Sequence, residues 1–357
     1  MTFGKIAVLG LGKVGRLAAE LLAEADFSVT GIDSREVRPA DFLLVTADLG
    51  DPEALRDALS EQEAVLSCLP YALNRDVASL AHALGIHYFD LTEDVPATKH
   101  IRELAETSKG IMAPQCGLAP GFVGIVGAHL AEQFERVRSI RMRVGALPQH
   151  PTGLLGYAFN WSPEGVVNEY LNDCEVIEEG VLKTVSSMEW LETLYVNGVK
   201  LEAFTTSGGL GTMCETYADH IENLDYKTMR YPGHMALMNF FFHELLMREN
   251  REAAGKILTH AKPPVDDDVV YVHVAAEGWQ EGRLSRKEFV NAYYPLEIGG
   301  KMRTAIAWTT SASVVAVIAM VREGHLPKRG FLKQEKVPFA PFLRTRTGNY
   351  YNVGSRP

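Results

Sequence analysis

Cysteine is scarce in this chain of 357 residues and is never clustered. The four cysteines are far apart and form no C-x-x-C pair; they are Cys68, Cys116, Cys174 and Cys214. A disulfide framework or a zinc cluster would need more cysteines or closer spacing, so we expect reduced thiols and a cytoplasmic protein. Histidine and acidic residues also lack metal-ligand spacing, and we therefore expect no metal site.

Long apolar runs and an excess of positive charge are missing as well. No segment reaches the roughly 18 consecutive apolar residues of a membrane helix, and the N-terminus has no leader pattern. The apolar run 311–321 is followed by Arg322 and Glu323 and predicts a buried helix. The chain has 35 Lys and Arg against 45 Asp and Glu, a formal net charge of −10. This balance argues against nucleic acid and an anionic membrane as partners.

Short apolar runs and helical patterns alternate in the first third of the chain. The predicted strands are 5–9, 28–32, 42–46, 64–69, 87–91 and 110–115. Between them, helices are predicted at 14–25, 51–59, 74–84 and 101–107. This alternation predicts a Rossmann-type α/β domain with a parallel sheet, over residues 1–121.

The pattern changes after Gly121. Residues 138–145 alternate charged and apolar side chains, which is typical of a strand with one wet face. Further strands and a few helices follow, including helices at 211–223 and 233–247. We predict a second, α+β domain with a largely antiparallel sheet over 122–303. Residues 304–357 are predicted to form a helix returning to the first domain and a tail on the surface.

Three glycines form the motif that indicates a cofactor. Gly10, Gly12 and Gly15 have G-x-G-x-x-G spacing, after a predicted strand and before a predicted helix. The first allows a tight turn, the second lets the backbone approach a pyrophosphate, and the third lets helix and strand pack closely. The unpaired N–H groups of the helix N-terminus then face the phosphates. Lys13 and Val14, inside the motif, are expected to contact the cofactor too.

The second strand ends in Asp33, at the distance where an acid binds the ribose hydroxyls of NAD. Arg35 could instead receive the 2′-phosphate of NADP, and Ser34 lies between them. We expect NAD, with NADP possible. The remaining cofactor contacts are predicted where the third and fourth strands end, at Asp48, Leu69 and Pro70. Capping of a helix is the alternative role for Asp48.

Several later motifs together resemble the saccharopine dehydrogenase family. They are L-P-Y-A-L-N (69–74), H-Y-F-D-L-T-E-D (87–94), C-G-L-A-P-G (116–121), T-S-G-G-L-G-T (206–212) and R-Y-P-G-H (230–234). With S-P-E-G (162–165), the last two are most similar to the lysine 6-dehydrogenase branch. The resemblance implies hydride transfer between a nicotinamide and a carbon that bears nitrogen. It also implies that 122–303 serves substrate binding and dimerisation, so we expect a homodimer.

Chemistry at a C–N bond requires a proton acceptor and a group that holds the substrate carboxylate. Arg230 is the predicted carboxylate clamp, because a guanidinium binds a carboxylate with two hydrogen bonds. The predicted catalytic residues are Asp90, Cys116 and His234. Helix capping, packing of a buried thiol and a structural histidine are the respective alternatives.

Further substrate contacts are predicted from the same motifs, at Tyr71, Asn74, Glu93, Ser207 and Gly208. Glu93 and Asp94 are candidates for amine binding or proton transfer, with capping of the next helix as the alternative. A plain glycine turn is the alternative for Ser207 and Gly208.

Three functions remain open at the level of sequence. The first is an NAD(P)-dependent oxidoreductase that deaminates an amino acid, as lysine 6-dehydrogenase does. The second is a condensing reductase similar to saccharopine reductase or carboxynorspermidine dehydrogenase. The third is an NAD(H)-binding sensor or scaffold without turnover.

Overall fold

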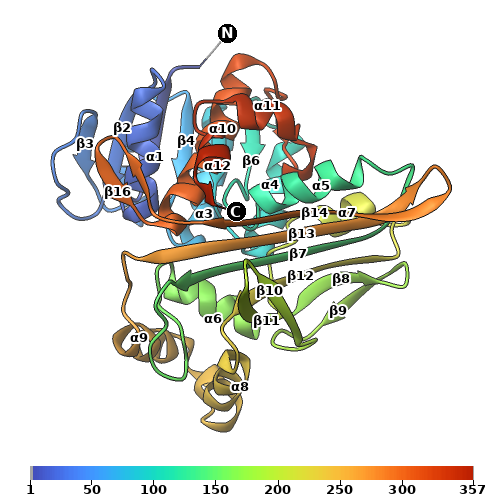
Figure 1. Cartoon of the computed structure of the whole chain (residues 1–357). Helices are drawn as coiled ribbons and strands as arrows, with labels where there is room; N and C mark the ends of the chain where they lie inside the picture. Colours follow the sequence, from blue (N-terminus) through green and yellow to red (C-terminus); the bar gives the residue numbers. More distant parts are fainter. Residues whose placement is uncertain (1–2, 357) are drawn as a thin grey trace. The chain divides into compact units, whose positions relative to one another are not determined.

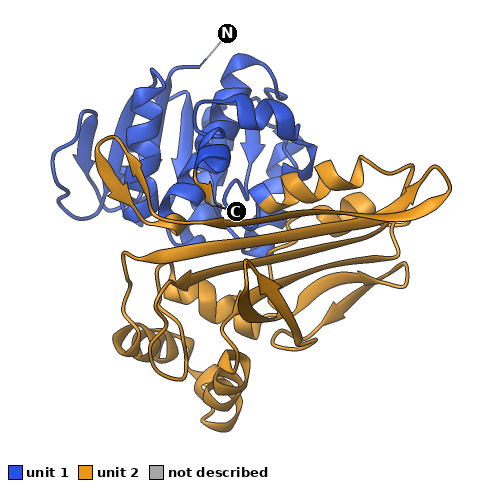
Figure 2. Ribbon diagram, viewed as in Figure 1, with its two compact units in different colours: residues 1–122, 307–353 blue, residues 123–306, 354–357 orange. Residues whose placement is uncertain are grey.

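The computed structural model describes residues 3–356, which form two compact units (Figure 2). Unit 1 comprises residues 1–122 and 307–353, and unit 2 comprises 123–306 and 354–357. The chain therefore passes between units near residues 122, 306 and 353. The domain boundaries expected from the sequence were 121/122 and 303/304.

Unit 1 is built on a seven-stranded, fully parallel sheet in the order β17-β6-β5-β4-β1-β2-β3 (Figure 1). The strands are β1 (Lys5–Leu9), β2 (Ser28–Asp33), β3 (Leu43–Thr46), β4 (Ala64–Ser67), β5 (His87–Asp90), β6 (Ile111–Ala113) and β17 (Gly330–Phe331). The helices between them are α1 (Lys13–Glu24), α2 (Pro52–Leu59), α3 (Tyr71–Leu84) and α4 (Val95–Ala105). This arrangement confirms the predicted Rossmann-type sheet. The strand order reverses between β1 and β4, where ligands bind in such sheets.

Local sequence signals explain the helix ends of unit 1. Asp51 caps α2, because its side chain accepts a backbone N–H of the first turn. Pro52 fits this first turn, because the N–H that proline lacks would have no partner within the helix there. Gly85 ends α3 in the left-handed conformation, at φ +72°. The core below these helices is apolar and includes Val65, Val77 and Ile101.

The C-terminal segment completes unit 1. After α10 (Ala305–Glu323) come β17, η3 (Gln334–Lys336), α11 (Phe339–Arg344) and α12 (Tyr350–Val353). The expectation of a surface tail is wrong, because Phe342 and Tyr351 are buried against Phe122. The many charged residues of this segment make its sequence look like an exposed tail. Its few aromatic residues nevertheless bury enough apolar area to pack against the protein.

Helix α10 is the one helix of the described residues that is long and apolar enough to cross a membrane, with a mean hydropathy of 1.6. However, 83% of it is buried within the protein. This burial is typical of a core helix and agrees with the sequence prediction. Its first turn is capped by Asp268, whose carboxylate accepts the N–H groups of Ala305 and Ile306.

Unit 2 contains a nine-stranded mixed sheet, whose main path is β10-β11-β12-β7-β13-β14-β18. Its strands are β7 (Arg136–Pro148), β8 (Cys174–Glu178), β9 (Val181–Val185), β10 (Glu192–Val196), β11 (Val199–Thr205), β12 (Asn223–Arg230), β13 (Asp268–Gln280), β14 (Arg283–Tyr293) and β18 (Ser355–Arg356). β12 and β7 are parallel, and the other pairs are antiparallel. A separate hairpin is formed by β15 (Leu296–Ile298) and β16 (Lys301–Arg303).

The helices of unit 2 cover this sheet. They are α5 (Phe122–Ala131), α6 (Pro163–Leu171), α7 (Met213–Tyr217), α8 (His234–Asn239), the π-helix η1 (Phe240–Glu244), η2 (Met247–Glu249) and α9 (Arg251–Ala261). α6, α8 and α9 lie on one side of the sheet (Figure 1), around a core that includes Tyr170, Met238 and Leu258. The long helix predicted at 211–223 is wrong, since only α7 forms there.

Strand β12 was missed because its sequence, NLDYKTMR, is too polar to read as a buried strand. All of its residues after Asn223 are nevertheless buried, including Asp225, Lys227 and Arg230. A charged side chain in a buried strand needs partners that come from other parts of the chain. Those partners are not visible in the local pattern.

Candidate functional site

The glycine loop of unit 1 has the shape that a dinucleotide requires. Gly10 has φ +83°, and a Cβ there would lie 2.8 Å from the carbonyl oxygen of Cys68. A Cβ on Gly15 would lie 1.9 Å from the carbonyl oxygen of Gly10, so only glycine lets α1 pack on the loop. Gly12 is exposed, and a Cβ on it would meet no atom within 4 Å, which leaves room for a pyrophosphate. The residues therefore fit a dinucleotide at the N-terminus of α1.

Asp33 is tied to this loop at the end of β2. Its Oδ2 accepts the backbone N–H of Leu11 at 2.8 Å, and its Oδ1 accepts the backbone N–H of Arg35 at 3.0 Å. Burial would raise the pKa of Asp33, but the hydrogen bonds from Arg35 and Leu11 outweigh it and lower the pKa. The Arg35 side chain is 79% exposed and only 3.4 Å from Asp33. An exposed guanidinium beside a paired acid is suited to a 2′-phosphate.

The other predicted cofactor residues lie at this same edge of the sheet. Leu69 lies close to Gly10, and Pro70 precedes α3. Lys13 and Val14 begin α1, and Ser34 follows β2. Asp48 does not cap α2, since Asp51 does; instead, Asp48 Oδ1 accepts the N–H of Gly50 at 3.0 Å.

Asp90, at the end of β5, was predicted to be catalytic, and the structure shows how it is bound within the protein. It is fully buried and accepts three hydrogen bonds, from the backbone N–H groups of Thr92 and Gln115 and from the hydroxyl of Tyr88. Burial raises the pKa of Asp90 to about 6, although these bonds favour its charged form. A carboxylate with these partners fixes the loops after β5 and β6 and has no free face for a substrate.

Glu93 differs from the two acids beside it. Asp94 caps α4 by accepting the N–H of Ala97 at 2.8 Å, and Asp90 is occupied as described. Glu93 is half-buried, and within residues 3–356 only its own backbone N–H supports its charged form. Burial, and then the nearby Asp94 and Asp90, raise the pKa of Glu93 to about 7. A partly accessible carboxyl with such a pKa suits proton transfer near neutral pH.

Cys116 was predicted as a catalytic candidate, but it is fully enclosed. Its Sγ donates to the carbonyl of Ala113 at 3.1 Å and accepts from Nε2 of Gln334 at 3.2 Å. Burial raises the pKa of the Cys116 thiol well above its usual value, and the charge of Asp90 adds to this. A neutral thiol without access holds its loop in place and is unsuited to nucleophilic or acid–base work.

Gln334, in the C-terminal segment, is a residue of this cluster that no motif marks. It is 4% exposed, and its Nε2 also donates to the carbonyl of Pro114 at 2.9 Å. It therefore links the last part of the chain to the loop after β6. Sequence analysis had no signal for it, because the link spans most of the chain.

Asn74 and Tyr71 lie in the first turns of α3. Asn74 is buried, and its Oδ1 accepts the hydroxyl of Ser67 at 2.7 Å, so this amide ties α3 to β4. Tyr71 is half-buried at the start of the helix. Its predicted substrate contact remains a prediction, whereas Asn74 has a structural partner for its oxygen.

Arg230, at the end of β12 in unit 2, is almost completely buried, with 2% exposure. Its Nε donates to the hydroxyl of Tyr170 at 2.7 Å, and its Nη1 donates to the carbonyl of Met229 at 2.9 Å. The guanidinium also lies over the ring of Tyr157, 4.7 Å from the ring centre. Within residues 3–356 it forms no ion pair, and Nη2 has no hydrogen-bond partner. A buried cation with free donors is complementary to a carboxylate ligand.

His234, predicted as a proton relay, lies beside Arg230 and is 1% exposed. Its Nε2 is 2.9 Å from the Tyr170 hydroxyl, and its Nδ1 is 2.9 Å from the carbonyl oxygen of Leu155. Burial and then the charge of Arg230 lower the pKa of His234 to about 3. The ring is therefore neutral near pH 7, and this argues against a role as proton relay.

Ser207 and Gly208 follow β11 in a tight turn, as the alternative interpretation had it. The N–H of Ser207 donates to the carbonyl of Glu169 at 3.1 Å, so it is not available to a substrate. Gly208 has φ +84° and accepts from Gly211. The next residue, Gly209, is required because a Cβ there would lie 2.3 Å from the ring of Tyr226.

The described residues contain no group of three or more His, Cys, Asp or Glu side chains that could hold a metal ion.

Two family models match nearly the whole chain. The saccharopine dehydrogenase NADP binding domain matches residues 6–113, and the saccharopine dehydrogenase C-terminal domain matches residues 117–345. The first match confirms a nicotinamide-dinucleotide domain, as predicted.

Individual relatives agree with the family models. Saccharopine dehydrogenase [NADP(+), L-glutamate-forming] of Schizosaccharomyces pombe is 25% identical over 50% of this chain and 39% of its own length. The mitochondrial alpha-aminoadipic semialdehyde synthase of Mus musculus is 25% identical over 61% of this chain and 25% of its own length. The matched regions thus span less than half of these curated relatives.

A solved structure supports the same fold. The saccharopine dehydrogenase (L-Glu forming) of Saccharomyces cerevisiae covers 98% of both chains with a TM-score of 0.78 at 17% identity. Because two family models together account for both units, the chain belongs to the saccharopine dehydrogenase family.

Proposed function

We propose that this protein is an NADP(H)-dependent oxidoreductase that acts on the C–N bond of an amino acid. The observation that carries the proposal is Arg230, a buried guanidinium with free donors and no ion pair within residues 3–356, whose charged form is favoured by the nearby carboxylate of Glu169. The glycine loop of unit 1 supplies the place for the dinucleotide, which accepts or donates hydride when it is bound. The relatives' names support both the substrate class and NADP.

In this proposal Glu93 exchanges the proton of the substrate nitrogen. In the oxidative direction its carboxylate keeps the amine neutral, and in the reductive direction its protonated form returns the proton. A pKa of about 7 allows both states near neutral pH. Asp90, Cys116 and Gln334 hold the loops around it rather than contacting the substrate.

Arg35 is proposed to bind the 2′-phosphate of NADP, since its guanidinium is exposed next to Asp33. Asp33 remains able to accept a ribose hydroxyl at Oδ2, which accepts only the N–H of Leu11, whereas Oδ1 accepts both the backbone N–H and the Nε of Arg35. NAD is thus the weaker cofactor in this proposal.

Two candidate substrates follow from the comparisons and from the structure. L-Saccharopine is the first candidate, because curated relatives are named saccharopine dehydrogenase. L-Lysine, deaminated at its terminal amine, is the second. It is favoured by the buried arginines: of the two, Arg143 is paired with carboxylates and Arg230 alone is available, which suits a substrate with one carboxylate to be clamped.

A turnover screen tests the proposal. The purified protein is incubated with NADP or NAD and with L-saccharopine, L-lysine or a panel of other amino acids and diamines, and reduced nicotinamide is followed by absorbance. We expect turnover of L-saccharopine or L-lysine that Arg230→Ala abolishes while NADPH binding persists. Tight NADPH binding without turnover on the whole panel would instead support a sensor. A homodimer through unit 2 is also proposed, and light scattering of the purified protein tests it.

A further inference from the structure

Tyr170 and His234 stand behind the Arg230 guanidinium in a continuous line of hydrogen bonds. The line runs from Arg230 Nε to the Tyr170 hydroxyl at 2.7 Å, then to His234 Nε2 at 2.9 Å. It ends where His234 Nδ1 meets the carbonyl oxygen of Leu155 at 2.9 Å. All three side chains are buried, so water does not compete for these bonds.

The direction of each bond follows from the chemistry of its ends. A carbonyl oxygen only accepts, so the His234 proton must be on Nδ1. In a neutral ring Nε2 is then an acceptor, and the Tyr170 hydroxyl donates to it. The Tyr170 oxygen is left to accept from Arg230 Nε, which only donates. Each donor thus has one acceptor, and the line has a single consistent arrangement.

A protonated His234 would break this arrangement. Its Nε2–H and Arg230 Nε–H would both point at the Tyr170 oxygen, and the Tyr170 proton would lose its acceptor. Arg230, Tyr170 and Tyr157 face the ring, Glu202 binds the backbone on both sides of it, and the charge of Glu169 acts on Arg230 and Tyr170; of these groups, Arg230 is the one that affects the pKa of His234. Burial and Arg230 accordingly lower the pKa of His234 to about 3.

The His234 ring is also held from its backbone. Glu202, opposite Arg230 in the β11–β12 register, accepts the N–H of Gly233 at 2.8 Å and that of Met235 at 2.7 Å. The two carboxylate oxygens thus fix the residues on both sides of His234. The ring stacks on Phe204 with an interplanar angle of 15°. The His234 ring is thus fixed by its two ring nitrogens, by its backbone and by Phe204. A side chain held in this way is suited to orienting its neighbours rather than to transferring a proton.

We propose that Tyr170 and His234 are positioning residues that aim the Arg230 guanidinium, with His234 acting as a fixed hydrogen-bond acceptor and not as an acid or base. This inference rests on the proposed function of Arg230 as carboxylate clamp. Binding Arg230 through Nε leaves Nη2 and one N–H of Nη1 for the ligand. A tilt of the guanidinium would misplace both donors at once.

Two substitutions of His234 test the roles of its two ring nitrogens separately. In His234→Gln the side-chain amide reaches the place of Nε2 and can still accept from Tyr170. In His234→Asn the amide reaches only the place of Nδ1, so the bond to Leu155 is kept and the acceptor for Tyr170 is lost. Tyr170→Phe removes the hydroxyl and serves as the reference for a broken line.

Kinetics with the substrate that the wild type turns over, L-saccharopine or L-lysine, give the first measurement. We expect His234→Asn and Tyr170→Phe to raise the substrate KM about tenfold, the loss of one strong hydrogen bond. His234→Gln should stay within about threefold, and kcat, the NADP KM and the shape of the pH profile should be unchanged in all three. A lost limb of the pH profile in His234→Asn, equal effects of Asn and Gln, or an unchanged KM in Tyr170→Phe would overturn the proposal.

NMR of the ¹⁵N-histidine-labelled protein gives a second measurement that needs no substrate. The His234 resonances, assigned through His234→Asn, should show a neutral ring protonated on Nδ1 from pH 5 to pH 9, and Tyr170→Phe should shift Nε2. Titration of His234 in this range, or a proton on Nε2, would overturn the proposal even if turnover is found. If neither substrate is turned over, the proposed function fails, and the NMR result alone decides whether the line of hydrogen bonds exists.

Discussion

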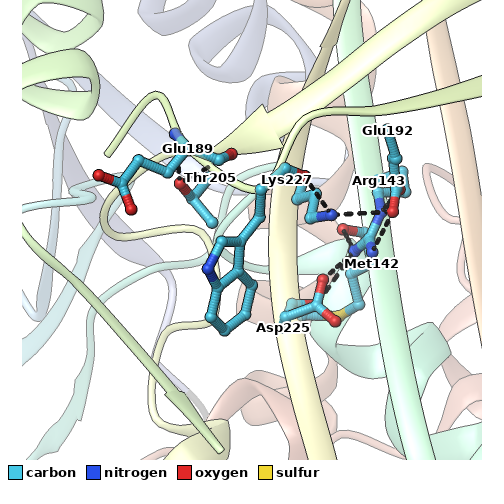
Figure 3. A network of polar contacts seen from close by, with 8 residues as sticks. Met142, Arg143, Glu189, Glu192, Thr205, Asp225 and Lys227 are labelled. Carbon is cyan, nitrogen blue, oxygen red and sulfur yellow. Dashed lines mark hydrogen bonds and ion pairs between the residues drawn. The ribbon is translucent and has the colours of Figure 1, made fainter. Parts of the chain in front are cut away.

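Two arginines are buried in the sheet of unit 2, on the neighbouring strands β7 and β12, and their surroundings are opposite. Arg143 on β7 is 3% exposed and meets two carboxylates: Nε and Nη2 donate to Glu192, and Nη1 forms an ion pair with Asp225 (Figure 3). Arg230 on β12 is equally buried but meets a hydroxyl, a carbonyl and an aromatic ring. The same residue type thus forms direct ion pairs in one place, whereas in the other it has only the nearby charge of Glu169 and keeps free donors.

The Arg143 cluster is complete within the chain. Lys227 joins it by donating to Glu192 at 2.8 Å and to the carbonyl of Trp190, so two cations face two anions (Figure 3). Burial opposes the charge of Glu192, but Arg143 and then Lys227 prevail and lower its pKa to about 2. This cluster holds residues 190–192 onto the sheet, and its charges need no ligand. The two arginines therefore differ in their direct partners and not in their burial: carboxylates pair with Arg143, whereas donors of Arg230 are left free.

The largest effect is expected from Arg230→Met. It should lower kcat/KM for the amino-acid substrate on the order of 1000-fold, since a two-bond carboxylate clamp is lost. The free energy of unfolding should stay the same or rise, because an unpaired buried charge is replaced by an apolar side chain of similar length. Steady-state kinetics and urea denaturation measure both. A marked loss of stability would place Arg230 with Arg143 and break the comparison.

Arg143→Met is the matched variant and should have the opposite effect: it should lower the free energy of unfolding and leave kcat/KM nearly unchanged. Removing this cation leaves Glu192 and Asp225 partly buried without it and should reduce the free energy of unfolding by about 3 kcal/mol. The folding equilibrium would change about 150-fold, while kcat/KM of the folded protein would remain near that of the wild type. Urea denaturation checks this. Arg143→Lys keeps the positive charge and should lose less of the free energy of unfolding. If Arg143→Met lowered kcat/KM as much as Arg230→Met does, the two arginines would not differ in the way described.

Glu93→Gln extends the comparison to the acids of unit 1. Glu93, whose pKa is raised to about 7, must be deprotonated in the oxidative direction, so wild-type kcat/KM should rise with pH up to about 7 and then level off. The substitution should remove this limb and lower the plateau about 100-fold. Asp94→Asn, which alters the cap of α4 and removes a charge that raises the pKa of Glu93, is the control and should keep the limb, moved to lower pH. An unchanged pH profile in Glu93→Gln would remove Glu93 from the chemistry.

The smallest effect concerns the cofactor. Arg35→Ala should raise the KM for NADP about tenfold and leave the KM for NAD unchanged, because only NADP carries the 2′-phosphate. Initial rates with each cofactor measure this. Arg38→Ala removes a neighbouring charge in the same loop and serves as the control. Equal changes for both cofactors would show that Arg35 does not recognise the phosphate.

How much the sequence could predict depends on how local each feature is. The glycine loop and Asp33 follow from short motifs, and the structure places them as predicted. The caps at Asp51 and Gly85 also depend on local signals. Arg230 was identified by its motif although its strand was missed. Tyr170 and Gln334 were missed because their roles depend on partners far away in the chain.

The same limit applies to the predicted catalytic residues. The sequence predicts Asp90, Cys116 and His234 as catalytic by residue type, but their hydrogen bonds decide what they can do. Each has its polar atoms occupied by the protein. Only the hydrogen-bond partners in the folded structure distinguish these three residues from Glu93.

The pairing of β17 with β6 joins residue 330 to residue 111, and this has a consequence for biosynthesis. A ribosome must make residues 123–306 of unit 2 before the last strand of the unit 1 sheet exists. Until then, the β6 edge is open and Cys116 lacks Gln334. The unit that starts first is therefore completed only after residues 123–306 have been made, and a chain that stops before residue 330 leaves that edge unpaired, where it can join other chains.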